Sequence, residues 1–366
     1  MNQNIYTTYC IGIDNEISIN SNNTKRFYNT IKYFKFWLYY IVLILLNTHN
    51  NTKAKEFTVV HNRSERRIIL RDKNAAEPIY YGNVYTNIRE IFSLYTIVSE
   101  FSLWSRLKIF KQAIIEYYDI REHNVILIFW IDVYFWARWV EKVNPMAIRS
   151  YGHYDRLATN LSSLSSIYNY KFIMQQHGII GETPIKHKLK IDRLYVFNDI
   201  ELLKFKKHVV SNQNCLYEIN YFSVVDFISF DFNNDFVVGI AEQPYEIMAD
   251  LIEKLVVAFP SFCFAVMLHP NSNDIRYSRF TKYKNIKFFK KEKIININIL
   301  ITINSTLFLD YIHNGFNKIV ILIGPYPYLN KYSLIYNNVK CVNSIDASMD
   351  LMKKSYHEQV SNNIKN

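Results

Sequence analysis

Two short polar clusters in the C-terminal third of the chain have the residue types that hold phosphates. Each cluster comes directly after an apolar run: His269 and Pro270 after 262–268, and Asn304, Ser305 and Thr306 after 299–303. In an open α/β sheet, ligands bind outside the carboxyl ends of the strands, so two such clusters indicate one shared pocket. Hydroxyls and free backbone N–H groups bind phosphate oxygens, and a protonated imidazole offsets their charge.

Both clusters also have a structural interpretation. Asn304 or Ser305 is a suitable N-cap for the helix that follows, and His269 is compatible with a surface turn. Their pairing favours the phosphate site, in which Asn304, Ser305 and Thr306 bind the phosphate. His269 would then be a catalytic residue that neutralises or protonates the leaving phosphate.

A third cluster, Gln176-His177-Gly178, follows the apolar run at 172–174. A neutral imidazole at His177 would accept the proton of an attacking hydroxyl. Gly178 would let the loop backbone approach a ligand closely. The alternative is a turn histidine beside a turn glycine.

Glu242 and Gln243 follow another apolar run, at 236–240. We expect them to line the same pocket, with Glu242 accepting from a hydroxyl of the ligand. The alternative is that the segment simply begins a helix, with Pro244 in its first turn.

The elements that must position these residues form two α/β domains in the 366-residue chain. We expect a loosely ordered segment at 1–30, a first domain at 31–210, a linker at 211–234 and a second domain with a C-terminal helix at 235–366. The elements predicted in the first domain are strands at 57–60, 125–130, 171–175 and 192–197, a helix at 99–118, and a helix capped by Asn198 that runs to 207.

The second domain alternates regularly between strands and helices. The predicted strands are 236–240, 263–268, 286–289, 299–303 and 318–322, and the predicted helices are 245–259 and 307–314. Such alternation is typical of a parallel sheet with helical crossovers. Gly315 is expected to end its helix in the left-handed conformation.

The charge of the chain favours anionic partners. Its 43 Lys and Arg residues outnumber its 32 Asp and Glu residues and give a net charge of +11, which suits phosphates, acidic glycans or anionic lipid. Basic runs at 186–193 and 276–293 would attract an anionic acceptor or lipid headgroups, or are ordinary solvated surface. No nucleic-acid-binding motif is present, so we expect no nucleic-acid partner.

The most apolar stretch, 36–46, is 11 residues long, shorter than the roughly 20 of a membrane-spanning helix. We expect a buried strand or helix, with interfacial membrane attachment as the alternative, and no signal peptide. The four cysteines form no CxxC pair, which fits a reducing cytoplasm. The expected location is therefore the cytoplasm, either free or attached peripherally to the inner face of the membrane.

No DxD pair, Walker loop, GxGxxG or HExxH motif occurs in the chain. Each of these motifs supplies a metal or nucleotide site through its carboxylates, histidines or glycine-rich backbone. We therefore expect a reaction that needs no metal or other cofactor.

The three clusters resemble those of bacterial GT-B glycosyltransferases that build surface polysaccharides, over about residues 170–325. In the sialyltransferase and polysialyltransferase group, HP and S-S/T motifs hold CMP and its phosphate, and His269-Pro270 and Ser305-Thr306 match them. That group has an acidic D/E-D/E-G motif that supplies the base. This chain lacks it, and Gln176-His177-Gly178 stands in a comparable place.

The chain also resembles the CDP-glycerol glycerophosphotransferase family. That family has a histidine-glycine motif with a catalytic histidine, then an HP motif, then a serine-rich turn ahead of an aspartate. QHG at 176–178, HP at 269–270 and NSTLFLD at 304–310 follow that order. Gln176 occupies the place of the family's usual Trp.

These resemblances imply a GT-B fold, in which two Rossmann-like domains face a central cleft. The second domain would bind a nucleotide-activated donor, with a CMP-sugar such as that of sialic acid as first choice. Pro270, Gln243 and Glu242 would contact its nucleotide. The first domain would present a hydroxyl of a surface glycan or lipooligosaccharide, and His177 would be the base of an inverting transfer. The alternatives are a CDP-glycerol-like polyol-phosphate transferase, a UDP-sugar transferase and an inactive GT-B-like scaffold.

Overall fold

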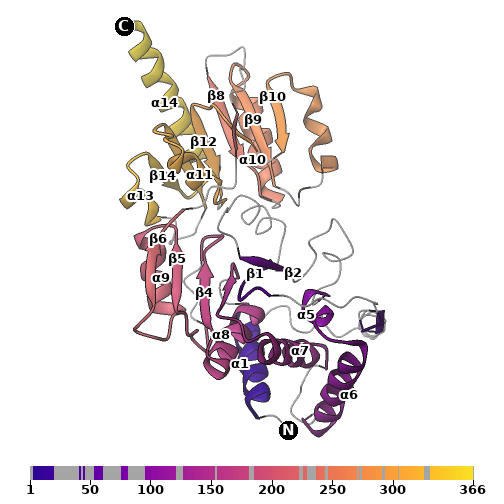
Figure 1. The fold of residues 1–366 in the computed structure, drawn as a ribbon. Coiled ribbons are helices and arrows are strands. Elements are labelled where there is room, and N and C mark those ends of the chain that lie inside the picture. The colour runs from indigo at the N-terminus through magenta and orange to yellow at the C-terminus, as the bar shows by residue number, and fades with distance from the viewer. Residues whose placement is uncertain are drawn as a thin grey trace. The chain divides into compact units, whose positions relative to one another are not determined.

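The chain folds into two compact α/β units, Met1–Phe222 and Ser223–Asn366, each with its own hydrophobic core (Figure 1). The computed structural model describes residues 3–19, 41–42, 44–45, 53–60, 76–80, 95–120, 127–152, 155–180, 185–221, 226–228, 236–243, 246–269, 272, 274–290, 293–303, 305–324 and 330–365. Pro270, Asn304 and Pro244 lie outside the described residues.

The first unit is built on a six-stranded parallel sheet with the order β2-β1-β3-β4-β5-β6. Its strands are β1 (Glu56–Val60), β2 (Glu77–Tyr80), β3 (Ala147–Ser150), β4 (Lys171–Gln175), β5 (Arg193–Val196) and β6 (Leu216–Ile219). This is a doubly wound order that reverses between β1 and β3, where such folds bind ligands. The strands predicted at 57–60, 171–175 and 192–197 are confirmed.

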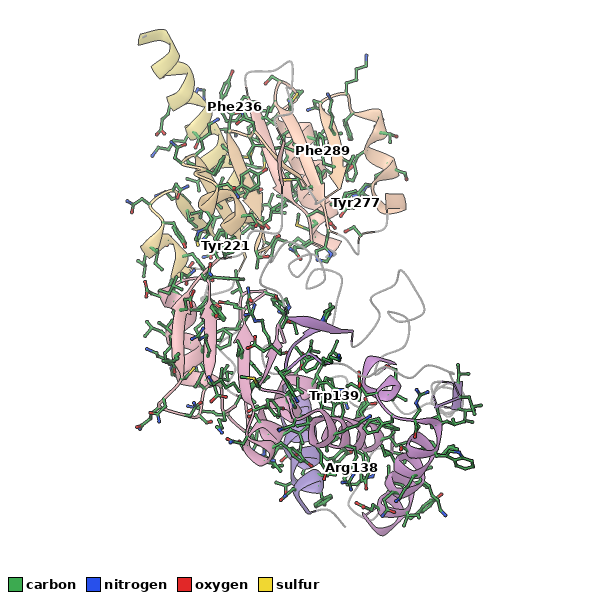
Figure 2. All side chains as sticks on the ribbon, viewed as in Figure 1. Arg138, Trp139, Tyr221, Phe236, Tyr277 and Phe289 are labelled. Carbon is green, nitrogen blue, oxygen red and sulfur yellow. The ribbon has the colours of Figure 1, made fainter. Side chains whose placement is uncertain are left out.

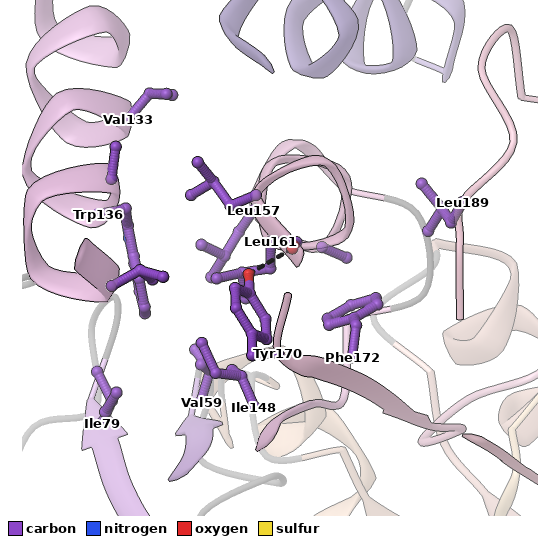
Figure 3. Close-up of a cluster of buried hydrophobic side chains, with 14 of the residues drawn as sticks. Val59, Ile79, Val133, Trp136, Ile148, Leu157, Leu161, Tyr170, Phe172 and Leu189 are labelled. Atoms are coloured by element: carbon purple, nitrogen blue, oxygen red, sulfur yellow. Dashed lines mark hydrogen bonds between the residues drawn. The ribbon is translucent and has the colours of Figure 1, made fainter. Parts of the chain in front are cut away.

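Helices pack against this sheet and against one another. They are α1 (Gln3–Ile19), α5 (Tyr95–Ser99), α6 (Leu103–Ile120), α7 (Leu127–Val143), α8 (Arg156–Tyr168) and α9 (Asp199–His208). Asp155 caps α8 by accepting the N–H of Ala158, and Asn198 caps α9 as predicted. Figure 3 shows Leu157 and Leu161 of α8 above the strand residues Val59 and Ile148.

Two sequence predictions for the first unit are wrong. The described part of the apolar run predicted as a strand at 125–130 is helical, because residues 127–130 begin α7, whose residues 130–137 are buried among other helices. A short apolar run has no period that separates a buried strand from a buried helix. The segment 1–30 is not loose throughout, because α1 packs on α7 and α8 through Ile5 and Tyr9.

The second unit has a six-stranded parallel sheet with the order β10-β9-β8-β12-β13-β14. Its elements are β8 (Val237–Ala241), α10 (Glu246–Ala258), β9 (Cys263–Leu268), the 3-10 helix η3 (Asp274–Lys282), β10 (Ile286–Lys290), β12 (Ile299–Thr302), α11 (Leu307–His313), β13 (Ile319–Ile323), α13 (Tyr332–Ile335), β14 (Val339–Val342) and α14 (Ile345–Lys365). A separate pair joins β7 (Asp226–Ile228) to β11 (Lys293–Ile295).

Numbered along the main sheet, the strands of the second unit follow the dinucleotide-binding order 3-2-1-4-5-6. The alternation predicted from the sequence is confirmed, and Gly315 has a φ of 83° after α11. Gly239 in β8 is closely packed, since a Cβ there would lie 2.5 Å from Cδ1 of Ile297 and the end of that side chain would have to shift. None of the helices in the described ranges is long and apolar enough to cross a membrane.

Ile5→Ala tests whether α1 is part of the folded core. Ile5 is fully buried, so we expect its truncation to lower the free energy of unfolding by about 2–5 kcal/mol. Urea denaturation of the full chain measures this change. Leu203→Ala on α9 is the control, because Leu203 is 66% exposed and should cost no more than about 0.5 kcal/mol. Equal costs for the two variants would mean that α1 is not docked.

Candidate functional site

Glu242 organises the carboxyl edge of the sheet in the second unit. It follows β8 and is fully buried. Its Oε2 accepts the backbone N–H of His269 at 2.7 Å and also the hydroxyl proton of Ser272, while its Oε1 accepts from the Tyr277 hydroxyl at 2.6 Å. Tyr277 belongs to η3 and is labelled in Figure 2. One carboxylate therefore ties the end of β8 to the segment that follows β9.

These contacts change the expected role of Glu242. Three donors within the protein satisfy the buried carboxylate, as a buried charge requires. Glu242 therefore holds His269 in place, and its predicted direct contact with a nucleotide stays a prediction. Gln243 is partly buried in the same loop after β8.

Ser305 is joined to the same edge through Thr302. The Thr302 hydroxyl donates to the carbonyl oxygen of Ala241 at 3.1 Å and accepts the Ser305 N–H at 3.2 Å. Ser305 is 1% exposed, and its Oγ accepts the N–H of Leu307 at 3.3 Å. In that contact the Ser305 oxygen is the acceptor, so the hydroxyl proton of Ser305 is not used in it and can be donated to a ligand.

Thr306 stands at the start of α11. It is partly exposed, and its side chain makes no capping hydrogen bond. Ser305 therefore acts partly as a helix cap, because its hydroxyl oxygen accepts a backbone N–H of the first turn. The Thr306 side chain has no capping role.

The structure brings the predicted residues of the second unit to three neighbouring strand ends. Glu242 follows β8, His269 follows β9 and Ser305 follows β12, and β8 lies between the other two strands. The strand order reverses between β8 and β12, which is where doubly wound sheets bind ligands. The two polar clusters thus share one edge of the sheet, as the sequence predicts.

His177 lies at the equivalent edge of the first unit. It follows β4, is partly exposed, and its Nδ1 bonds the carbonyl oxygen of Tyr151, just after β3. A carbonyl only accepts, so Nδ1 is the protonated nitrogen. In the neutral ring the lone pair then lies on Nε2, which is the nitrogen that can take up a proton.

Gln176 anchors the loop that presents His177. It is 3% exposed, and its Nε2 donates to the Gly178 carbonyl oxygen at 2.9 Å and to Oε2 of Glu201 at 2.5 Å. Its Oε1 accepts the Phe197 N–H at 2.9 Å. Gln176 therefore has a structural role: its hydrogen bonds hold the loop that carries the candidate base, His177.

A buried ion pair that the sequence analysis missed lies behind this loop. Glu201 and Lys204 of α9 are 0% and 4% exposed, and Lys204 Nζ lies 2.7 Å from Oε1 of Glu201. The pair also holds Ile180, whose N–H donates to Glu201 at 3.1 Å and whose carbonyl accepts from Lys204 at 3.2 Å. The i, i+3 spacing of the two charges was visible in the sequence, but their burial was not.

Part of the basic run at 186–193 forms ion pairs and hydrogen bonds within the first unit. Lys186 Nζ and His187 Nε2 lie 2.7 Å and 3.0 Å from Oδ2 of Asp14 in α1. Hydrogen bonds from Lys186 and then His187 hold the pKa of the Asp14 carboxyl below its usual value. These two residues attach α1 to the loop after His177.

Metal-ligating side chains do not gather in groups of three or more within the ranges that the structure describes. The expectation of a metal-independent reaction stays a prediction.

Glu201→Gln tests the anchoring of the His177 loop. The change leaves the buried Lys204 ammonium without its counter-charge, and we expect a loss of about 3–5 kcal/mol in the free energy of unfolding, measured by urea denaturation. Glu141→Gln is the matched control, since Glu141 forms an exposed i, i+3 pair with Arg138 at 2.8 Å and should cost less than about 1 kcal/mol. Similar losses in the two variants would contradict the anchoring role.

No protein-family model and no curated protein matches the chain. Among solved structures, the chain is similar to UDP-GlcNAc 2-epimerase from Neisseria meningitidis bound to UDP-GlcNAc, with a TM-score of 0.50, 11% identity, and 82% of this chain and 93% of that chain covered. It is also similar to S. aureus MnaA in a co-structure with UDP, with a TM-score of 0.47, 10% identity, and 83% of this chain and 90% of that chain covered. A further similar structure is Acinetobacter baumannii MurG, with a TM-score of 0.42, 8% identity, and 82% of this chain and 90% of that chain covered. The similarity to the Neisseria structure, together with two parallel six-stranded sheets, shows a GT-B fold.

Proposed function

We propose that the chain is a glycosyltransferase that moves a sugar from a nucleotide-activated donor to a hydroxyl of a surface glycan or lipooligosaccharide. One observation carries the proposal: His269 and Ser305 follow the two strands on either side of β8, and Glu242 at the end of β8 accepts the backbone N–H of His269 beside the strand-order reversal. A nucleotide's phosphate is the ligand that suits such an edge. The second unit is therefore the donor-binding unit of the proposal.

On the donor side, the proposal gives each residue a distinct task. Ser305 and Thr306 donate hydroxyl protons to the donor phosphate. His269, when protonated, offsets the charge that develops on the phosphate as the bond to the sugar breaks. Pro270 and Gln243 contribute to the nucleotide site, and Asn304 to the phosphate site, as the sequence predicts.

On the acceptor side, His177 is the general base. Its Nδ1 is held by the Tyr151 carbonyl, so Nε2 takes the proton of the acceptor hydroxyl as that oxygen attacks the anomeric carbon. The bond between the anomeric carbon and the donor phosphate breaks in the same step, and the nucleotide leaves with the bonding electrons. A single displacement of this kind inverts the anomeric configuration and needs no metal in the proposed mechanism.

The donor nucleotide is proposed to be CMP, because the HP and serine-threonine motifs match those of CMP-sugar enzymes. A UDP-sugar is the second donor to test, since the similar Neisseria epimerase is bound to UDP-GlcNAc. A CDP-polyol is the third, because a CDP-glycerol-like transferase would use the same histidines. In all three cases we propose that the protein works on the cytoplasmic face of the membrane.

A thermal-shift screen with CMP, CDP, UDP and GDP tests nucleotide binding. We expect CMP to raise the melting temperature of the wild type, and His269→Ala to weaken CMP binding about tenfold or more, because a charge-assisted contact to phosphate is lost. His177→Ala should bind CMP as the wild type does. His357→Ala is the matched control, because His357 is an exposed histidine on α14. A chain that no nucleotide stabilises would instead be the inactive scaffold.

Turnover tests the role of His177. With the sugar donor of the nucleotide that binds, His177→Ala should transfer sugar to acceptor glycans, and so release free nucleotide, at least about a hundredfold more slowly, as expected when a general base is removed. His269→Ala should impair both binding and turnover. Wild-type turnover in either variant would show that the role given to that histidine is wrong.

A further inference from the structure

Helix α6 exposes a continuous stripe of apolar and basic side chains. At about 100° per residue, one sector of about 100° contains Trp104, Leu107, Lys108, Lys111, Ile115 and Tyr118. Trp104 is 80% exposed and Tyr118 59%. Exposed apolar side chains that gather on one face mark interaction sites, whereas apolar residues scattered singly over a surface are ordinary.

The opposite face of α6 is fixed in the first unit. The Ala113 carbonyl accepts from Trp130 Nε1 at 2.8 Å, and Glu116 accepts from the Tyr134 hydroxyl at 3.0 Å. Arg106 is buried, and its Nε donates to the Phe101 carbonyl at 2.7 Å. The helix therefore cannot turn its apolar stripe inward without losing these contacts.

A second exposed apolar segment adjoins α6. Ile41, Val42 and Leu45 are 45%, 38% and 61% exposed, and Arg106 Nη1 lies 3.4 Å from the carbonyl oxygen of Ile44. These residues come from the most apolar stretch of the chain, for which the sequence predicts burial. Among its described side chains only Ile44 is buried, so three of the four face solvent.

The charge on the stripe selects among possible partners. Lys108 and Lys111 are exposed beside Trp104, and no acidic residue stands in the same sector of α6. A symmetric contact between two copies would place this stripe against the same stripe of the other copy, and the lysines of the two copies would face each other. Like charges in an interface are unfavourable, whereas anionic headgroups complement them.

We propose that the exposed stripe of α6, with Ile41, Val42 and Leu45, docks on the surface of an anionic lipid bilayer. Trp and Tyr have an apolar body and a polar tip, so they prefer the membrane–water interface. Leu107 and Ile115 enter the acyl boundary, and the two lysines meet anionic headgroups. The helix lies in the plane of the interface and does not span the bilayer. This docking does not depend on the proposed glycosyltransferase activity.

Co-sedimentation of the full chain with vesicles tests the proposal. The vesicles are phosphatidylcholine alone, or phosphatidylcholine with about a third phosphatidylglycerol. We expect binding to the anionic vesicles that falls as salt rises. Lys108→Gln with Lys111→Gln should weaken this binding about fivefold per lysine, and Trp104→Ser with Ile115→Ser should weaken it at least about tenfold.

Leu334→Ser with Val257→Ser is the matched control, because these apolar residues of the second unit are 82% and 60% exposed. That variant should bind as the wild type does, and circular dichroism should show the native fold in all variants, since every change is at the surface. Three outcomes would overturn the proposal: no binding of the wild type to either vesicle, equal loss in the control, or a dimer by light scattering that only the Trp104 variant disrupts.

Discussion

A buried carboxylate must be surrounded by donors, and in the second unit this requirement fixes the position of the candidate site. Glu242 has no exposed surface and collects its donors from the segment after β9 and from η3. Removing a charge from water is costly unless each oxygen is paired. The segment that carries His269 is therefore held to the end of β8, beside the strand that leads to Ser305.

The first unit uses the same arrangement with different residues. Glu201 is also fully buried, and its partners are Gln176, Ile180 and Lys204. In both units a buried acid therefore stands behind the loop that carries a candidate histidine. Loops with few internal contacts are mobile, so such anchors supply the rigidity that a catalytic group needs.

The sequence predicts the second unit better than the first, for a physical reason. Its strands are short apolar runs bounded by polar segments or by the helices α10 and α11, so the hydrophobic pattern changes at each boundary. In the first unit, the run at 125–130 leads into a helix whose residues 130–137 are all buried, and periodicity cannot identify such a helix. The polar composition of 3–19 likewise hid Ile5 and Tyr9, the buried apolar residues that dock α1.

The sequence predicts the site residues as clusters at strand ends, but it does not predict the buried residues that hold those clusters in place. Tyr277 is 35 residues from Glu242, and Glu201 is 25 residues from Gln176. Contacts over such separations depend on the packing of the whole unit, and local patterns do not contain them. Glu242 itself was named for its position after a strand, and the structure supplies the different role of holding His269.

Hydrogen exchange of the full chain with and without CMP tests the central claim most directly, which is that a nucleotide phosphate binds at the ends of β8, β9 and β12. We predict slower exchange of the amides of Glu242, His269 and Ser305 when CMP is bound, with little change along α14. CMP binding that protects other segments and leaves these three amides unchanged would contradict the proposed site.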